Sequence, residues 1–170
     1  MLTLDLCCAC SDTADSERAY DYAVDVPSTG WTSADTLFYP FTITDPPQVR
    51  TPLVAGTSYH ATYHVRTAAQ FGLTHLPVSI ILQQVDTLGA GETSHVVRNV
   101  LRHETSLPVR DEQGRPLGDS WGSLYQYEAP IDSLTLRFDA AGYYRMLLIP
   151  STGNTAAFTG IHSIGISLAE

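Results

Sequence analysis

Lysine is absent from this 170-residue chain, so all nine of its basic residues are arginine. The absence removes each chemistry that needs a primary amine on a side chain: the phosphate-binding lysine of a Walker A loop, a Schiff base, and a lysine general base. P-loop nucleotide hydrolysis and Schiff-base catalysis are therefore excluded.

Cysteine and long apolar runs are also scarce. The only cysteines, Cys7, Cys8 and Cys10, lie together near the N-terminus, so no disulfide can frame the rest of the chain. No run of 18 apolar residues occurs, which argues against a membrane-spanning helix. No segment carries a sustained apolar stripe with a period of 3.6 residues, and "TAAQFG" at 67–72 predicts at most one short turn.

Positive charge is outnumbered two to one. Eighteen acidic residues against nine basic ones give a net charge of −9 and a pI near 4.9. A surface of this sign repels phosphate backbones, so nucleic acid is not an expected partner.

Apolar and polar residues alternate along several short segments, as they do in a strand with one buried face. In residues 36–43 one face carries Leu37, Tyr39, Phe41 and Ile43. The same period of two occurs in residues 58–66, 132–139 and 162–170. The positions predicted to share one face in these three segments are Tyr59, Ala61, Tyr63, Val65, Leu134, Leu136, Phe138, Ile164, Ile166 and Leu168.

Two denser apolar runs, residues 77–85 and 143–149, are typical of central strands. Turn sequences rich in glycine and proline separate the runs. Pro40 predicts a strand at a sheet edge, because proline cannot donate a hydrogen bond to a neighbouring strand. We expect an all-β fold, an antiparallel β-sandwich of roughly eight or nine strands, formed by a single domain over residues 18–170.

Residues 118–122, "GDSWG", match the G-x-S-x-G pattern of a hydrolase nucleophile elbow at Ser120. Such a serine stands between a strand and a helix, and its histidine partner follows later in the chain. Here the residues after Ser120 alternate and end at a proline, and the single downstream histidine, His162, lies inside a strand pattern. We interpret the motif as a turn whose glycines permit positive φ, with no catalytic residue.

Metal binding is a weaker alternative. His60 and His64 share a strand face but lie about 13 Å apart, too far for one tetrahedral zinc. Asp111, Glu112 and Asp119 offer oxygen ligands without the spacing of a calcium loop, so a solvated acidic loop is the default interpretation. We predict no metal and no cofactor.

Carbohydrate binding is a second alternative function. Nine tyrosines and two tryptophans on a β-sandwich could form a stacking platform for a glycan. Alternation, however, places many of these rings in the core, where aromatic side chains more often pack than bind ligands.

The cysteine cluster resembles the end of a bacterial lipoprotein signal. Cys10 is the best candidate for lipidation, because the small residue Ala9 precedes it and the polar segment "SDTADSE" follows. Asp5 gives Cys7 and Cys8 poorer cleavage contexts. We expect residues 1–9 to be a truncated or incomplete signal, residues 10–17 a flexible acidic tether, and the acyl chains on Cys10 a stable membrane anchor, at about 0.8 kcal/mol per buried CH₂.

From Cys10 to the C-terminus the chain resembles the gliding-motility lipoprotein H (GldH) family. The resemblance is carried by an ordered set of motifs: "RAYDYAVDVPSTGW", "DTLFYPFTITD", "YHATYHVRT", "DEQGRPLGDSWGSLYQYEAPI", "AGYYRMLLIP" and "GIHSIGISL". The fourth is the most specific and resembles the family's glycine-rich core, in which Ser120 occupies a variable position. Residues that the family pattern marks as structural are Trp31, Arg66, Gly114, Gly118, Gly122, Tyr125, Gly142, Tyr143 and Gly165.

The resemblance implies a cell-envelope lipoprotein of the gliding machinery, a system tied to type IX protein secretion in Gram-negative bacteria. It implies a membrane and other envelope proteins as partners, and no enzymatic activity. We therefore expect a non-catalytic scaffold or assembly component that is held at a membrane by its lipid.

Overall fold

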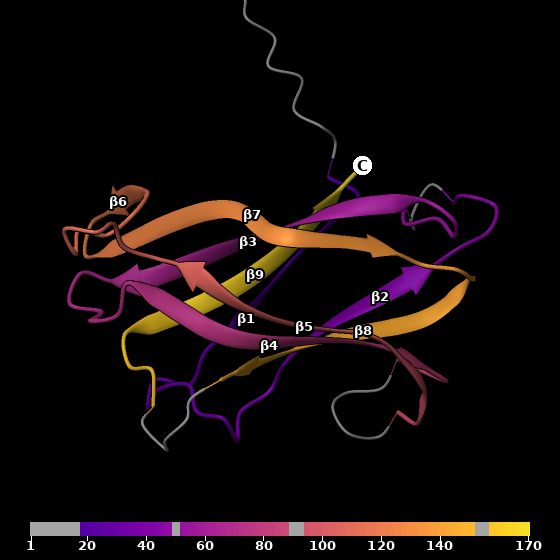
Figure 1. The fold of residues 1–170 in the computed structure, drawn as a ribbon, viewed down its shortest axis with the longest axis horizontal. Coiled ribbons are helices and arrows are strands. Elements are labelled where there is room, and N and C mark those ends of the chain that lie inside the picture. Colours follow the sequence, from indigo (N-terminus) through magenta and orange to yellow (C-terminus); the bar gives the residue numbers. More distant parts are fainter. Residues whose placement is uncertain (1–17, 49–51, 89–93, 152–156) are drawn as a thin grey trace, which may run out of the picture.

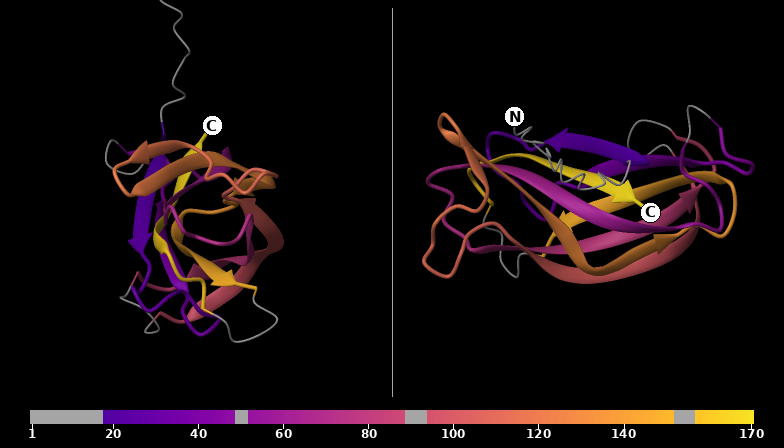
Figure 2. Two further views of the ribbon diagram at one scale, coloured as in Figure 1. Left: turned by 90° about the vertical axis from the view of Figure 1, so that its left-hand side faces the viewer. Right: turned by 90° about the horizontal axis from the view of Figure 1, so that it is seen from above.

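In the computed structural model, residues 18–48, 52–88, 94–151 and 157–170 are described. They form nine strands in two antiparallel sheets that lie face to face (Figures 1 and 2). The described residues include no helix that is long and apolar enough to cross a membrane. The predicted antiparallel β-sandwich is confirmed.

The five-stranded sheet has the order β1-β9-β3-β7-β6, and the four-stranded sheet has the order β2-β8-β4-β5. The strands are β1 (Tyr20–Asp25), β2 (Leu37–Ile43), β3 (Ser58–Ala68), β4 (His75–Val85), β5 (Val96–Pro108), β6 (Asp119–Trp121), β7 (Leu124–Arg137), β8 (Gly142–Pro150) and β9 (Ile161–Ala169).

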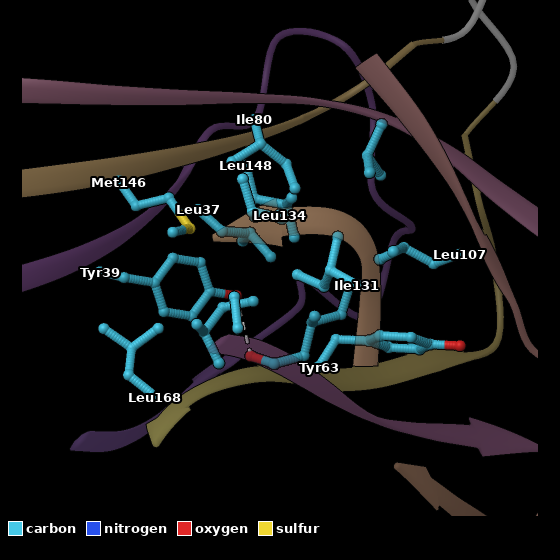
Figure 3. Packing of buried hydrophobic residues seen from close by; sticks show 14 of the residues in the cluster. Leu37, Tyr39, Tyr63, Ile80, Leu107, Ile131, Leu134, Met146, Leu148 and Leu168 are labelled. Carbon is cyan, nitrogen blue, oxygen red and sulfur yellow. Dashed lines mark hydrogen bonds between the residues drawn. The ribbon is translucent and has the colours of Figure 1, made fainter. Parts of the chain in front are cut away.

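The alternation in the sequence sets which residues meet between the sheets. All the positions predicted to share one face in residues 36–43, 58–66, 132–139 and 162–170 are buried. The dense runs become the central strands β4 and β8, and Pro40 lies on the edge strand β2, as predicted. Figure 3 shows part of the resulting core, in which Tyr39 and Tyr63 lie among leucine and isoleucine side chains.

Three tyrosines direct hydroxyl groups into or beside this core. Tyr39 donates to the carbonyl of Ile164 on the opposite sheet at 3.0 Å, and Tyr63 donates to the carbonyl of Pro108 at 2.5 Å. The hydroxyl of Tyr20 is buried without a partner in the described part of the chain. Burial raises the pKa of all three side chains above the usual tyrosine value, so the fold holds them in the neutral form.

The outer face of the five-stranded sheet carries a charged cluster built on a glycine. Gly165 on β9 lies opposite His64 on β3, and a Cβ at Gly165 would lie 1.8 Å from the histidine ring. The ring therefore lies against the sheet, where its Nε2 contacts Asp21 at 2.9 Å. Arg18, the first described residue, reaches Glu128 at 2.5 Å and Asp21 at 3.3 Å.

A β-hairpin formed by β6 and the start of β7 lies at one edge of this sheet. Its two-residue loop has Gly122 at a positive φ of 65°, which fits the first position of a type II′ turn. Gly118 at the hairpin entrance has a φ of 79°, and a Cβ there would lie 2.0 Å from the carbonyl oxygen of Gln126. Gly118 thus needs both an unusual backbone conformation and the absence of a side chain.

Replacing Gly118 by alanine is expected to destabilise the fold more than replacing Gly122. Both variants place a Cβ at positive φ, which costs about 1 kcal/mol, but only Gly118→Ala also forces the β7 backbone aside, for a total above about 2 kcal/mol. Urea unfolding of the two variants measures the difference. Equal losses would show that the close approach at Gln126 does not constrain the hairpin.

Gly165→Ala is expected to lower the free energy of unfolding by about 1–3 kcal/mol, because the new methyl group must displace the His64 ring. The double variant with His64→Ala should recover most of that additional loss. Gly72→Ala is the matched control, since no atom lies within 4 Å of a Cβ there. An additive double-mutant cycle would contradict the assignment of the loss to the ring.

The stability of the fold is expected to fall at alkaline pH. The unfolded chain ionises its tyrosines near pH ~10, whereas the raised folded pKa values keep Tyr20, Tyr39 and Tyr63 protonated; each therefore removes up to about 1.4 kcal/mol per pH unit above that point. Lysine, which titrates in the same range, is absent. Urea unfolding as a function of pH should show a shallower fall for Tyr39→Phe, and a slope equal to that of the wild type would assign the titration to other groups.

Candidate functional site

The serine of the G-x-S-x-G motif stands on an exposed hairpin strand. Ser120 lies in β6 and pairs with Tyr125 on β7, and the chain turns back immediately after Trp121. A nucleophile elbow places a helix at this point, whose amides supply the oxyanion hole. The hairpin provides a different local structure, so the geometry does not assign a nucleophilic role to Ser120.

Asp111 organises the backbone of the loop between β5 and β6. Asp111 accepts hydrogen bonds from the backbone amides of Gln113 and Arg115 at 3.0 and 2.8 Å, and from the Arg115 guanidinium at 2.6 Å. The Arg115 backbone amide, followed by its side chain, lowers the pKa of Asp111. Arg110 crosses the loop to the carbonyls of Gly114 and Ala69. Asp111 is therefore engaged by the loop itself.

The two histidines of β3 do not form a metal site together. His64 contacts Asp21, while His60 lies exposed further along the strand. Within the described ranges, no group of three or more histidine, cysteine, aspartate or glutamate residues could hold a metal ion. Cys10, the predicted lipidation residue, lies outside the described residues.

The remaining residues marked by the family resemblance lie in the core, in loops and on the outer faces of strands. Trp31 is fully buried and donates its indole N–H to the carbonyl of Asp35 at 2.8 Å. Tyr125 is half-buried in β7. Gly114 adopts a φ of 76° in the Asp111 loop, and Gly142 adopts a φ of 143° at the start of β8. Tyr143 and Arg66 point outward, from β8 and β3 respectively.

A pocket of about 460 Å³ opens on the outer face of the five-stranded sheet, beside the hairpin. It is lined by Arg66 on β3, Leu124 and Gln126 on β7, and Trp121 on β6. The Arg66 Nε donates to the Gln126 Oε1 at 3.1 Å. The sequence motif drew attention to Ser120 and its flanking glycines, whereas the pocket is built by Trp121 and by Gln126, two residues that the motif did not single out.

A second hollow of about 420 Å³ lies over the four-stranded sheet. Its lining residues, from β4 and β5, are Ile81, Gln83, Asn99, Val100, Leu101 and Arg102. Beside it, Arg145 lies over the ring of Phe38 at 5.8 Å and donates to Gln83 at 2.9 Å. This face combines partly exposed apolar side chains with polar groups, a composition that suits contact with another protein.

The prediction that many aromatic rings lie in the core is confirmed. Trp31, Tyr39, Tyr59, Tyr63 and Tyr144 are each 0% exposed. The most exposed aromatic ring among the large hydrophobic residues of the described chain is Trp121, at 74%. An aromatic platform for a glycan on the outside of the sandwich therefore depends chiefly on this residue.

Comparison with known proteins gives one extensive match. A sequence model of the family described as GldH lipoprotein matches residues 18–168. No curated protein matches the chain.

Two viral proteins are among the similar solved structures. The Tobacco streak virus coat protein is 8% identical, with 88% of this chain and 86% of that chain covered and a TM-score of 0.23. A chain of infectious bursal disease virus, Gx strain, is 9% identical, with a TM-score of 0.28; the match covers 90% of this chain but only 30% of that one. Both TM-scores are too low to support a structural argument.

The family match begins at Arg18, the first residue of the charged cluster, and extends to Leu168 in the last strand of the sandwich. The chain therefore belongs to the GldH lipoprotein family, a family of gliding-motility-associated lipoproteins that are anchored by lipid in the cell envelope.

Proposed function

We propose that this chain is a non-catalytic scaffold or assembly component of the gliding machinery, a system linked to type IX secretion, and that a lipid on Cys10 holds it at a membrane of the envelope. The observation that carries the proposal is the family match over residues 18–168, which covers the first eight strands in full and β9 as far as Leu168. GldH lipoproteins are not a known enzyme family.

The contacts of the polar residues support a structural role for them. Asp111 is occupied by backbone amides and by Arg115, and His64 lies against Gly165 and Asp21. A catalytic pair needs a group within hydrogen-bond reach of a nucleophile and access to substrate. The named contacts instead use these side chains to fix loops and strands.

The start of the sandwich suits a protein held by its N-terminus. Arg18 is joined to Glu128 and Asp21, so the first described residue is attached to the sheet by side-chain contacts. Residues 11–17 would span at most about 25 Å when extended. A lipid on Cys10 would therefore keep the sandwich close to the bilayer while leaving it free to turn.

The outer face of the four-stranded sheet is the proposed contact surface for another envelope protein. It carries the hollow over β4 and β5, the Arg145–Phe38 pair and the 43% exposed ring of Tyr143. Exposed aromatic and arginine side chains are enriched in protein interfaces.

Lipidation is expected at Cys10 alone. When the gene is expressed with its native upstream sequence and a fatty-acid probe, Cys10→Ala should lose the label and leave the membrane fraction. Cys7→Ala and Cys8→Ala are the matched controls and should keep it. Label retained in Cys10→Ala would remove Cys10 as the acylated residue.

The scaffold role is tested in the same cells with a photo-crosslinking residue at Asn99, which lines the hollow, and at His60 on the opposite outer face. Cross-links to other envelope proteins are expected from position 99 and not from position 60. A lipidated chain that yields no cross-link from position 99 would exclude this face as the contact surface.

A further inference from the structure

The exposure of Trp121 is unusual for so large an apolar side chain. The other tryptophan, Trp31, is fully buried, whereas Trp121 is 74% exposed at the edge of a pocket. It pairs with Leu124 across the two-residue turn, so the hairpin fixes the backbone that carries the ring. An indole has a broad apolar face with negative π charge, which attracts the weakly positive C–H groups on one face of a pyranose ring.

Arg66 gives the pocket its charge. Arg18, Arg98 and Arg115 each pair with a carboxylate, but among the described residues Arg66 has no carboxylate within ion-pair distance. Its Nε is held by Gln126, which leaves the two terminal nitrogens of the guanidinium to form a fork for a ligand. In a protein of net charge −9, this arrangement complements an anionic group.

The lining and the volume of the pocket suit a single sugar unit. Trp121 and Leu124 supply apolar surface, and Arg66 and Gln126 supply N–H donors on neighbouring strands. A volume of about 460 Å³ lies within the range of small-molecule sites. The adjoining edge strand β6 has only three residues, so it offers few backbone hydrogen bonds to an extended peptide strand.

We propose that this pocket binds a carboxylate-bearing saccharide unit, with the pyranose ring stacked on Trp121 and the carboxylate held by the Arg66 guanidinium. Asp119 lies across from Gln126 on β6, so the carboxylate of the ligand sits on the Arg66 side of the pocket. The site is independent of lipidation and of the face proposed for protein contact.

Titration of the purified full chain with a linear oligosaccharide of uronic acid units tests the site. Binding should change the fluorescence of the exposed Trp121 and should weaken as salt is added. Trp121→Ala and Arg66→Gln, measured by calorimetry, should each lower the affinity about tenfold or more, the effect of losing stacking or a charge-assisted hydrogen bond. Tyr22→Ala, which removes an exposed aromatic ring on β1 that does not line the pocket, should leave the affinity unchanged.

Two comparisons make the assignment specific. A neutral oligosaccharide of equal length and linkage should bind at least about tenfold more weakly, and Asp119→Asn should maintain or raise the affinity for the uronate. Loss of uronate binding in Asp119→Asn, equal binding of the neutral sugar, or an affinity unaffected by Trp121→Ala would overturn the proposal. Tighter binding of a short peptide through its C-terminal carboxylate would also overturn it and would assign the pocket to a protein partner.

Discussion

Contact between the inward faces of the two sheets determines which side chains are buried and which remain available on the outer faces. Alternation along each strand sends one set of side chains into that contact and the other set outward. The inward set is large and apolar, and Tyr39 even bridges the sheets through its hydroxyl group. Because the core uses only the inward positions, the outward positions can carry the charged cluster at Arg18, the pocket at Arg66 and the face around Arg145 without loss of packing.

The sequence revealed the central strands better than the edges. β3, β4, β8 and β9 bury one or both faces, so their apolar patterns are clear. The periodicity did not single out β1 or β5, which are edge strands with mostly exposed or half-buried residues. In β5, register shifts opposite Leu82 and Gln84 further disturb the period of two, as bulges do. Pro40 identified β2 as an edge because its signal is a missing donor and does not depend on burial.

At the surface, the sequence predicted the role of the glycines but not the exposure of Trp121 or the position of His64. The glycine motif indicated backbone shape, and Gly118 does approach the Gln126 carbonyl too closely for any side chain. The composition could not show that Trp31 is buried in the core while Trp121 is exposed to solvent, because the residue types are identical. That difference depends on the partners of β6 and β7 across the hairpin, which are known only once the register is known. His64 is a similar case, since its position depends on Gly165, 101 positions later in the chain and on a neighbouring strand.

The proposed saccharide pocket and the proposed protein-contact surface lie on different outer faces of the sandwich. Arg18, which directly follows the proposed tether, lies across the outer face of the five-stranded sheet, and the Trp121 pocket opens on that same face. A lipid on Cys10 would hold Arg18, and with it the end of the sandwich that Arg18 joins, within about 25 Å of the anchoring residue, since a short tether limits how far it can move away. The outer face of the four-stranded sheet lies on the opposite side of the sandwich (Figure 1). In the proposed arrangement, a saccharide and a protein partner would bind at the same time, because the two contact surfaces lie on opposite outer faces of the sandwich.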